Sequence, residues 1–407
     1  MAAPEVLAPA GDFECLRAAV LYGADAVYVG ARSFGMRASP KNFTMEELRR
    51  AAAHCHEHGA KLYLTCNILP TNEEADALPD FLRGAKAAGV DALIVADIGV
   101  LMLARRTVPE LEVHISTQAG VVNYLAATEL HHMGASRVVL ARELPLEEIA
   151  RLRDKTPPTL EIEAFVHGAM CMSFSGRCLI SQYLVERDAN RGECAQPCRW
   201  GYHLMEEKRP GQFFPVFEDE RGSYILSAQD LSMLPHLDKL AATGVGSFKI
   251  EGRAKSVYYV AVVTGAYRQA VDLLKKDPAH YDPPDWLIEE TKKVSYRRYS
   301  TGFYLKGEPP GQYYESGGYV RDWEVVATVD GWKDGMLLCT ERNRFVRGER
   351  LELLRPGGKP LPFVVESIRD EEGAGLAVAC HPMERLWLPC AQPVPAGAML
   401  RRRARDK

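Results

Sequence analysis

Several features that would assign a chain to a broad class at once are missing from these 407 residues. No apolar run approaches the roughly 18 residues that a membrane-spanning helix needs, so no membrane contact is expected. The N-terminal residues MAAPEVLAPAGDF lack a basic segment followed by an apolar one, so no signal peptide is predicted. These absences together predict a cytoplasmic protein without a membrane partner.

A strong excess of charge is also absent, since the formal net charge is −4. The chain as a whole therefore does not attract nucleic acid, and any RNA contact must come from a local basic patch. One candidate is the C-terminal run of Arg401, Arg402, Arg403, Arg405 and Lys407, interpreted either as a solvated tail or as an RNA contact. Two hydrolase signatures are missing too, the serine nucleophile elbow and the His-Glu-x-x-His zinc motif.

Cysteine, by contrast, is well represented and unevenly placed. Four of the ten cysteines fall within Glu163–Trp200, namely Cys171, Cys178, Cys194 and Cys198. In a reducing cytosol this clustering favours a metal site or catalysis over disulfides. The other six are scattered, and most of them are expected to be small buried hydrophobes: Cys15, Cys55, Cys66, Cys339, Cys380 and Cys390.

Spacing alone leaves four interpretations of the cysteine cluster open. The first pair has six residues between its members and the second has three, whereas structural zinc sites usually have about two to four. The spacing therefore favours an iron–sulfur cluster, whose loops are more irregular, over zinc. A catalytic cysteine with His167 as its base leaves the other cysteines unexplained, and disulfides are the fourth interpretation. Nearby arginines suit a thiolate cluster, an anionic substrate or a solvated surface: Arg177, Arg187, Arg191 and Arg199.

Up to about residue 275, short β-rich runs alternate with helical stretches. The β-rich runs are Val6–Ala10, Ala26–Gly30, Lys61–Ile68, Ala92–Asp97, Glu112–Thr117, Arg137–Ala141, Glu161–Val166 and Ser247–Glu251. This alternation predicts an α/β fold, a (β/α)8 TIM-like barrel over residues 1–277. The cysteines then lie in a long insertion after the seventh strand, at 168–226, and the helix of that unit is expected over Ser227–Ala242.

Alternation within the strands predicts which side chains enter the barrel. Glu163, Phe165 and His167 share one face of the seventh strand, and Lys249 and Glu251 share one face of the eighth. Because helices cover the outside, these mixed polar faces are expected to point inward. Barrel enzymes bind ligands at polar groups near the C-terminal strand ends. The alternative interpretation is that Glu163 and Lys249 pair with each other inside the barrel.

The pattern changes after the barrel. Residues 278–321 are expected to form a linker with a short helix, rich in aromatic, glycine and basic residues. Residues 322–407 are expected to form a small all-β barrel domain. Its predicted strands are Val325–Val329, Met336–Thr340, Arg350–Leu354, Phe363–Ile368, Leu376–Ala379 and Met399–Arg402.

Several motifs together resemble those of a known family. The cysteine stretch contains Glu163, Phe165, Gly168, Ala169, Cys171, Gly176, Cys178 and Ser181, followed by Arg187-Asp188-Ala189-Asn190-Arg191-Gly192, Cys194 and Gln196-Pro197-Cys198-Arg199. Further motifs are Ala8-Pro9-Ala10-Gly11, Ser116-Thr117-Gln118, Ala141-Arg142-Glu143, Lys249-Ile250-Glu251-Gly252-Arg253 and Thr301-Gly302-Phe303. By these motifs the chain resembles the collagenase-like peptidase family, family U, number thirty-two.

The resemblance implies two possible activities. The historical name implies a protease. Better understood members are oxygen-independent hydroxylases that carry a 4Fe–4S cluster on four cysteines, here Cys171, Cys178, Cys194 and Cys198. The length of this chain resembles the members that convert tRNA wobble uridine to 5-hydroxyuridine with prephenate as oxygen donor, whereas other members act on rRNA or on ubiquinone precursors.

The leading hypothesis is therefore an RNA hydroxylase. Its expected partners are tRNA, a small-molecule co-substrate and a second subunit of the same family. The candidate catalytic residues are Arg142, Glu143, Glu163, His167, Lys249, Glu251 and Arg253, and arginines suit the two carboxylates of prephenate. Arg297 and Arg298, with the β domain, are expected to hold tRNA. A protease that uses Cys171 or His167, and a binding module with structural zinc, are the alternatives.

Overall fold

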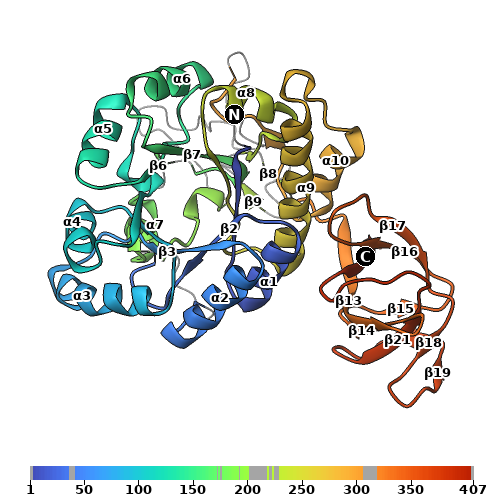
Figure 1. The fold of residues 1–407 in the computed structure, drawn as a ribbon. Coiled ribbons are helices and arrows are strands. Elements are labelled where there is room, and N and C mark those ends of the chain that lie inside the picture. The colour runs from blue at the N-terminus through green and yellow to red at the C-terminus, as the bar shows by residue number, and fades with distance from the viewer. Residues whose placement is uncertain are drawn as a thin grey trace, which may run out of the picture.

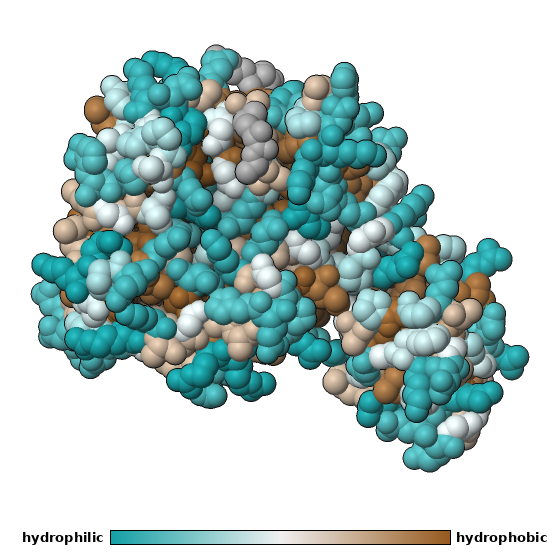
Figure 2. All heavy atoms as spheres, viewed as in Figure 1, coloured by the Kyte–Doolittle hydropathy of each residue, from teal (hydrophilic) through white to brown (hydrophobic). Residues whose placement is uncertain are grey.

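The computed structural model describes residues 3–35, 42–171, 173–174, 177–191, 193–200, 218–219, 222–223, 229–305 and 319–404. A large α/β part is followed by a smaller β domain at the C-terminal end (Figure 1). The face seen in Figure 2 is mainly hydrophilic, and hydrophobic side chains show mostly in recesses. Among the helices within these ranges, none combines the length and the apolar character needed to cross a bilayer.

The α/β part is a closed barrel of eight parallel strands. They are β1 (Glu5–Pro9), β2 (Ala26–Gly30), β3 (Lys61–Cys66), β4 (Ala92–Val95), β5 (Glu112–Ile115), β6 (Arg137–Val139), β7 (Glu161–Ala169) and β11 (Ser247–Ile250). Each strand pairs with the next, and β11 pairs in parallel with both β1 and β7, which closes the ring. The predicted TIM-like barrel is therefore confirmed.

Helices surround this ring (Figure 1). They are α1 (Phe13–Leu21), α2 (Met45–Glu57), α3 (Asn72–Ala87), α4 (Ile98–Thr107), α5 (Tyr124–His132), α6 (Leu146–Lys155), α8 (Leu237–Ala242) and α9 (Val257–Lys276). The predicted capping box at the start of α2 is present: the Thr44 hydroxyl accepts from the Glu47 amide, and the Glu47 carboxylate accepts from the Thr44 amide. This cap supplies partners to backbone amides that the helix itself leaves unsatisfied.

Side chains alternate between the two faces of the barrel wall as expected. On β3, Leu62 and Leu64 belong to the large core beneath the helices, whereas Tyr63 packs in a separate cluster with Leu7 and Tyr28. That second cluster lies inside the barrel. Beside it the interior holds a buried ionic network, in which Arg137 pairs with Glu5 and Glu163, and Glu163 pairs with Lys249.

The connection from β7 to β11 carries the cysteines. Its described elements are α7 (Ile180–Val185), η3 (Ala189–Arg191), η4 (Pro197–Arg199), β8 (Glu218–Asp219), β9 (Gly222–Ser223), β10 (Asp230–Ser232) and η5 (Leu234–His236). The helix expected to begin near Ser227 is shorter than predicted, because β10 runs antiparallel to β7 and α8 begins only at Leu237. Pro235 lies in the 3-10 turn before α8, where its missing amide hydrogen costs no helical hydrogen bond. Ser227 itself lies outside the described residues.

Residues between the barrel and the β domain do more than link them. They form η6 (Pro278–His280), α10 (Asp285–Glu290), η7 (Thr291–Lys293) and β12 (Tyr299–Ser300), and β12 pairs in parallel with β10. Arg297 is only 2% exposed and donates to both carboxylate oxygens of Asp230, through its side chain at 2.8 Å and its amide at 3.0 Å. The expectation that Arg297 contacts tRNA is therefore wrong, because a buried ion pair occupies its guanidinium. Arg298 is exposed.

The C-terminal domain is antiparallel β, as predicted. Its strands are β13 (Trp323–Lys333), β14 (Met336–Glu341), β15 (Phe345–Val346), β16 (Arg350–Leu354), β17 (Leu361–Val364), β18 (Ile368–Arg369), β19 (Gly375–Leu376), β20 (Val378–Ala379), β21 (Arg385–Pro389) and β22 (Met399–Arg403). The strand β21, which pairs with β14, was absent from the prediction. This domain has a hydrophobic core of its own, built around Val326, Leu337 and Leu400.

The basic C-terminal run is part of this domain and of its contact with the barrel. Arg401 is fully buried on β22 and bonds to Glu290 of α10 and to Glu352 of β16, each at 2.8 Å. Arg402 pairs with Glu324 at 2.7 Å. Arg401 and Arg402 therefore belong neither to a solvated tail nor to an RNA contact, because carboxylates within the protein neutralise their charges.

Candidate functional site

A cavity of about 160 Å³ lies at the C-terminal ends of the barrel strands. All four clustered cysteines line it, at Cys171, Cys178, Cys194 and Cys198. The barrel contributes polar and charged groups to the opposite wall, at Tyr28, Thr65, Asn67, Gln118, Arg142, Lys249, Glu251 and Arg253. The predicted meeting of the cysteine loop with polar strand ends at the barrel mouth is thus present in the structure.

Local hydrogen bonds brace the cysteine loop. Asn190 holds Cys178 from both sides, since its side-chain oxygen accepts from the Cys178 amide at 3.2 Å and its side-chain nitrogen donates to the Cys178 carbonyl at 3.0 Å. The buried Ser181 hydroxyl accepts from the Ala195 amide at 3.0 Å, which ties the first cysteine pair to the second. Arg177 anchors the loop to the barrel by donating to the Gln118 carbonyl at 2.6 Å.

Two of the sulfur atoms already accept backbone hydrogen bonds. The Ile180 amide donates to the Cys178 sulfur and the Gln196 amide donates to the Cys194 sulfur, both at 3.4 Å. Such donors stabilise a thiolate, which is the form of cysteine that binds metal. All ten cysteines are free thiols, so the four in the loop are not held in disulfides.

The remaining cysteines do not take part. Burial raises the pKa of the thiols of Cys15, Cys55 and Cys66 to about 12, so they stay protonated in ordinary buffer. Cys339 is buried within the β domain. For these four cysteines the interpretation as small buried hydrophobes is confirmed, whereas Cys380 is exposed and Cys390 half-buried.

Arg142 extends across the cavity from the end of β6. One of its terminal nitrogens donates to the Ala169 carbonyl at 2.8 Å, and its guanidinium carbon lies 3.8 Å from the centre of the Phe165 ring. A second terminal nitrogen is 3.7 Å from the Glu251 carboxylate. The buried Nε of Arg142 has no hydrogen-bond partner among the described residues. An unsatisfied guanidinium nitrogen beside a cavity is a ready donor for a bound anion.

Arg253 is seated against two glycines of the first two strand ends. Its Nη1 donates to the Thr65 hydroxyl at 2.7 Å. A Cβ atom on Gly30 would lie 2.5 Å from Nη1 of Arg253, and one on Gly11 would lie 2.2 Å from the Arg253 carbonyl oxygen. Gly11 therefore requires glycine, because a side chain there would collide with the Arg253 backbone, whereas a side chain at Gly30 would push the end of the Arg253 side chain out of its present position.

The two inward carboxylates have different surroundings. Glu251 lines the cavity, whereas Glu163 lies beneath it and is fully buried. The Lys249 ammonium is 2.7 Å from Glu163, and Arg137 is 3.0 Å away on the other oxygen. Burial alone would raise the pKa of Glu163, but the charges of Lys249 and Arg137 outweigh it and lower this pKa to about 2. The expected pairing of Glu163 with Lys249 inside the barrel is thus present, and it fixes Lys249 in the cavity wall.

Besides Glu163, two more predicted site residues do not reach the cavity. His167 was expected on the inner face, but the register of β7 and β11 shifts between Lys249 and Ile250, and His167 packs instead against tyrosines of α9 and β12. Its ring nitrogens lie 3.3 Å from the hydroxyls of Tyr267 and Tyr299, and burial lowers its pKa to about 3. Glu143 is half-buried and is absent from the cavity lining.

Other cavity residues were not among the candidate catalytic residues, although Ser116 and Gln118 belong to one of the motifs. Asn67 donates to the Gln118 side chain at 3.0 Å and to the Ser116 hydroxyl at 3.4 Å, which forms a polar row along the wall. The Tyr28 hydroxyl donates to the Ile250 carbonyl at 3.0 Å. Strand alternation places Asn67, Ser116 and Gln118 on the polar face, so their signal was present in the sequence.

Comparison with known proteins identifies the family. The model for peptidase family U32 matches residues 11–312, and that for the peptidase family U32 C-terminal domain matches residues 321–401. The tRNA hydroxylation protein P1 of Bacillus subtilis is 37% identical, with 94% of this chain and 90% of that protein covered. The tRNA hydroxylation protein P of Escherichia coli is 36% identical over 96% of this chain and 94% of its own length.

A third relative matches a smaller share of the chain. A 23S rRNA 5-hydroxycytidine synthase of Escherichia coli is 38% identical over 66% of this chain and 39% of that protein. The family models, by contrast, together span nearly all of the sequence, and the two tRNA hydroxylation proteins match over nearly their full lengths. The chain therefore belongs to peptidase family U32.

Proposed function

We propose that this chain hydroxylates RNA, with the wobble uridine of tRNA as substrate and 5-hydroxyuridine as product. Two relatives are named for tRNA hydroxylation and a third for 5-hydroxycytidine in ribosomal RNA, so hydroxylation of a pyrimidine is common to these names. One observation carries the proposal: four free thiols and three cationic side chains line the same cavity at the barrel mouth. That cavity combines a soft metal-ligand set with an anion site.

The donor set suits a 4Fe–4S cluster. Cys171, Cys178, Cys194 and Cys198 supply four thiolates, and backbone amides already donate to two of these sulfurs. Replacing C–H by C–OH is a two-electron oxidation of the base, and it balances when the oxygen donor is reduced as its C–O bond becomes C–H. A cluster bound there would pass these electrons one at a time. The residues of the loop would hold the cluster, and Asn190 would fix the position of Cys178.

The cationic wall suits an oxygen-donating dicarboxylate, which we propose to be prephenate. Arg142, Lys249 and Arg253 line the cavity, and Glu251 is the one carboxylate among its described lining residues. Glu163 lies below the cavity and pairs with both Lys249 and Arg137, so it offsets part of the Lys249 charge. Arginine binds carboxylates through paired donors, and Arg142 retains one buried nitrogen without a partner. If prephenate supplies the oxygen atom, the reaction needs no molecular oxygen.

RNA has a path to this cavity along a neighbouring groove. The groove shares Ala169, Gln196 and Glu251 with the cavity and continues past Lys255, Tyr319 and Arg321. Lys255 Nζ lies 4.0 Å from the centre of the Tyr319 ring. Cationic and aromatic side chains in one groove are the usual means of holding single-stranded nucleic acid, because they serve phosphates and bases respectively. We therefore assign tRNA contact to this groove in place of Arg297.

A thiol protease that uses Cys171 and His167 is poorly supported. A general base must reach the thiol and accept its proton, but both nitrogens of the His167 ring face tyrosine hydroxyls inside the protein. Its pKa of about 3 also makes it a weak base. This interpretation leaves three of the cysteines without a role.

The test combines metal content with RNA analysis. Protein purified without oxygen is expected to be brown and to hold about four irons per chain, as a 4Fe–4S cluster requires. Cys178→Ser should lose iron, whereas Cys66→Ser, a matched change at a buried cysteine outside the loop, should keep it. In cells that lack the gene, the wild-type chain should restore 5-hydroxyuridine to tRNA and Cys178→Ser should not.

Two results would count against the proposal separately. Iron-free, colourless protein from a careful anaerobic preparation would remove the cluster. Unchanged 5-hydroxyuridine in tRNA of cells that lack the gene would show that tRNA uridine is not the substrate. Equal peptide cleavage by wild type and Cys178→Ser in the same preparation would favour peptide hydrolysis as the activity.

A further inference from the structure

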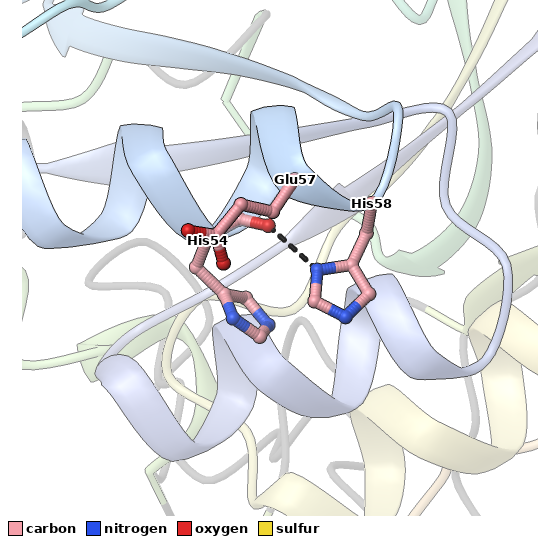
Figure 3. Close-up of side chains that lie close together, drawn as sticks. All are labelled: His54, Glu57 and His58. Carbon is pink, nitrogen blue, oxygen red and sulfur yellow. Dashed lines mark hydrogen bonds between the residues drawn. The ribbon is translucent and has the colours of Figure 1, made fainter.

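The last turn of α2 presents three potential metal ligands on one side of the helix (Figure 3). His54, Glu57 and His58 are spaced i, i+3 and i+4, which brings their side chains together on a helix surface. One ligand atom from each residue can be chosen so that all three lie within 4.8 Å of one another. The order His-x-x-Glu-His also occurs on known zinc helices, where the two histidines bind the ion and the glutamate is the general base.

The imidazole rings are prepared for coordination. Nδ1 of His58 lies 2.8 Å from the His54 carbonyl oxygen, so this nitrogen carries the proton and Nε2 keeps its lone pair (Figure 3). Metal-binding histidines typically donate their other nitrogen to a carbonyl or carboxylate in this way. The two ring centres are 4.4 Å apart.

The surroundings are a cleft where the barrel meets the C-terminal domain. His54 and His58 line a cavity of about 420 Å³ together with Arg17 of α1 and with Asp330 of β13. A cation there also lies at the C-terminal end of α2, where the helix dipole favours positive charge. Arg17 opposes this effect, and its charge is expected to weaken the binding of a cation without preventing it.

This cleft is remote from the cysteine cavity. The chain leaves α2 and enters β3 at Lys61, so the ligands lie at the N-terminal face of the barrel, whereas the cysteines lie at the C-terminal face. The donor sets differ as well, because imidazole and carboxylate select zinc-like ions and four thiolates select an iron–sulfur cluster. The two groups of residues thus require separate explanations.

We propose that His54, Glu57 and His58 bind one divalent transition-metal ion of the Zn2+ class, at a site separate from the cysteine loop. Three protein ligands leave a coordination position for water or for a group from the opposite wall of the cleft. Asp330 is the carboxylate of the C-terminal domain that lines that wall, and it accepts a hydrogen bond from Thr340 at 2.7 Å.

Cobalt titration of the full-length protein tests the proposal. Co2+ replaces zinc and gives visible bands, and thiolate ligands add a charge-transfer band that imidazole and carboxylate ligands do not. Because the cysteine loop could itself take up cobalt, the reference protein carries serine at Cys171, Cys178, Cys194 and Cys198, and the variants below are made in it. This reference protein should bind one Co2+ with a spectrum free of the thiolate band, and Zn2+ should displace it. His54→Ala and His58→Ala should each weaken this binding by at least tenfold, and Glu57→Gln should weaken it too.

His56→Ala is the matched control. His56 lies in the same helical turn, but its Nε2 is 3.0 Å from Asp91. It should bind Co2+ as the reference protein does. Equal weakening by His56→Ala, affinity unchanged in the double variant His54→Ala/His58→Ala, or a cobalt spectrum that always carries the thiolate band would each overturn the proposal. Circular dichroism of each variant verifies that α2 remains folded, and alanine on this exposed turn favours the helix.

Discussion

Replacement of Glu163 by glutamine is the sharpest test of how the barrel interior supports the cavity. The carboxylate is fully buried between Lys249 at 2.7 Å and Arg137 at 3.0 Å. Glutamine has nearly the same shape as glutamate but no charge. Lys249 and Arg137 would therefore stay buried with one negative charge fewer beside them. Removing one partner of a buried ion pair costs about 3–5 kcal/mol of unfolding free energy.

The pKa of Glu163 gives a second measure of the same interaction. Its value falls from 4.5 to about 2 in the folded protein, which corresponds to about 3 kcal/mol of stabilisation. Because the folded-state pKa is the lower one, this stabilisation is complete above the unfolded value of 4.5 and is lost as the pH falls toward 2. The difference between wild type and Glu163→Gln should therefore be constant near neutral pH and shrink below pH 4.5.

The assay is urea unfolding followed by circular dichroism at several pH values. Glu161→Gln is the matched control, because Glu161 lies on the same strand and contacts the same Arg137 at 2.6 Å, yet its side chain is 57% exposed. That change should cost about 0–1 kcal/mol. Adding Lys249→Met to Glu163→Gln should recover part of the loss. If Glu163→Gln and Glu161→Gln were equally mild, the buried network could not be what holds Lys249 in place.

Three further predictions concern the site and the domain contact. Arg142→Lys should raise the KM for the anionic co-substrate with little change in iron content, since lysine lacks the paired donors of arginine; unchanged KM in steady-state assays would contradict the anion site. Asn190→Ala should lower the iron content of anaerobically purified protein, because Cys178 loses both of its backbone partners, and full iron occupancy would show that the brace is dispensable. Arg401→Met should make the β domain more sensitive to limited proteolysis, because the buried Glu290 loses the closer of its two cationic partners and keeps only Lys293 at 3.4 Å; an unaltered digestion pattern would argue against this anchor.

Much of the fold could be predicted from the sequence because barrel strands carry a local signal. Each of the eight β-rich runs became a strand, and alternation separated Leu62 from Tyr63 correctly. The helix expected from Ser227 failed because β10 owes its form to pairing with β7, a contact between residues about 60 positions apart. Pairing at such a distance leaves no periodicity in the short segment itself.

The candidate site was predictable in its cysteines and less so in its acid–base residues. Clustering of Cys171 with its three partners is visible in the chain, and they do line one cavity. The prediction that His167 points into the barrel was wrong because the pairing of β7 with β11 shifts by one residue just before it. Strict alternation of side chains along a strand cannot predict such a shift. The group His54, Glu57 and His58 was not predicted, because the His-Glu-x-x-His zinc motif has its glutamate beside the first histidine, whereas here the glutamate precedes the last one.

The seat of Arg253 between Gly11 and Gly30 has a consequence for recombination. Residues at the start of the chain and residues after β11 form one mechanical unit, although more than 200 positions separate them in the sequence. A chimera that takes the first two strands from one relative and the eighth from another would combine Gly11 and Gly30 of one protein with the Arg253 segment of the other, and the two need not fit in shape. Gene shuffling within this family should therefore exchange both ends of the barrel together, and crossover points should fall outside the arc from β11 to β2.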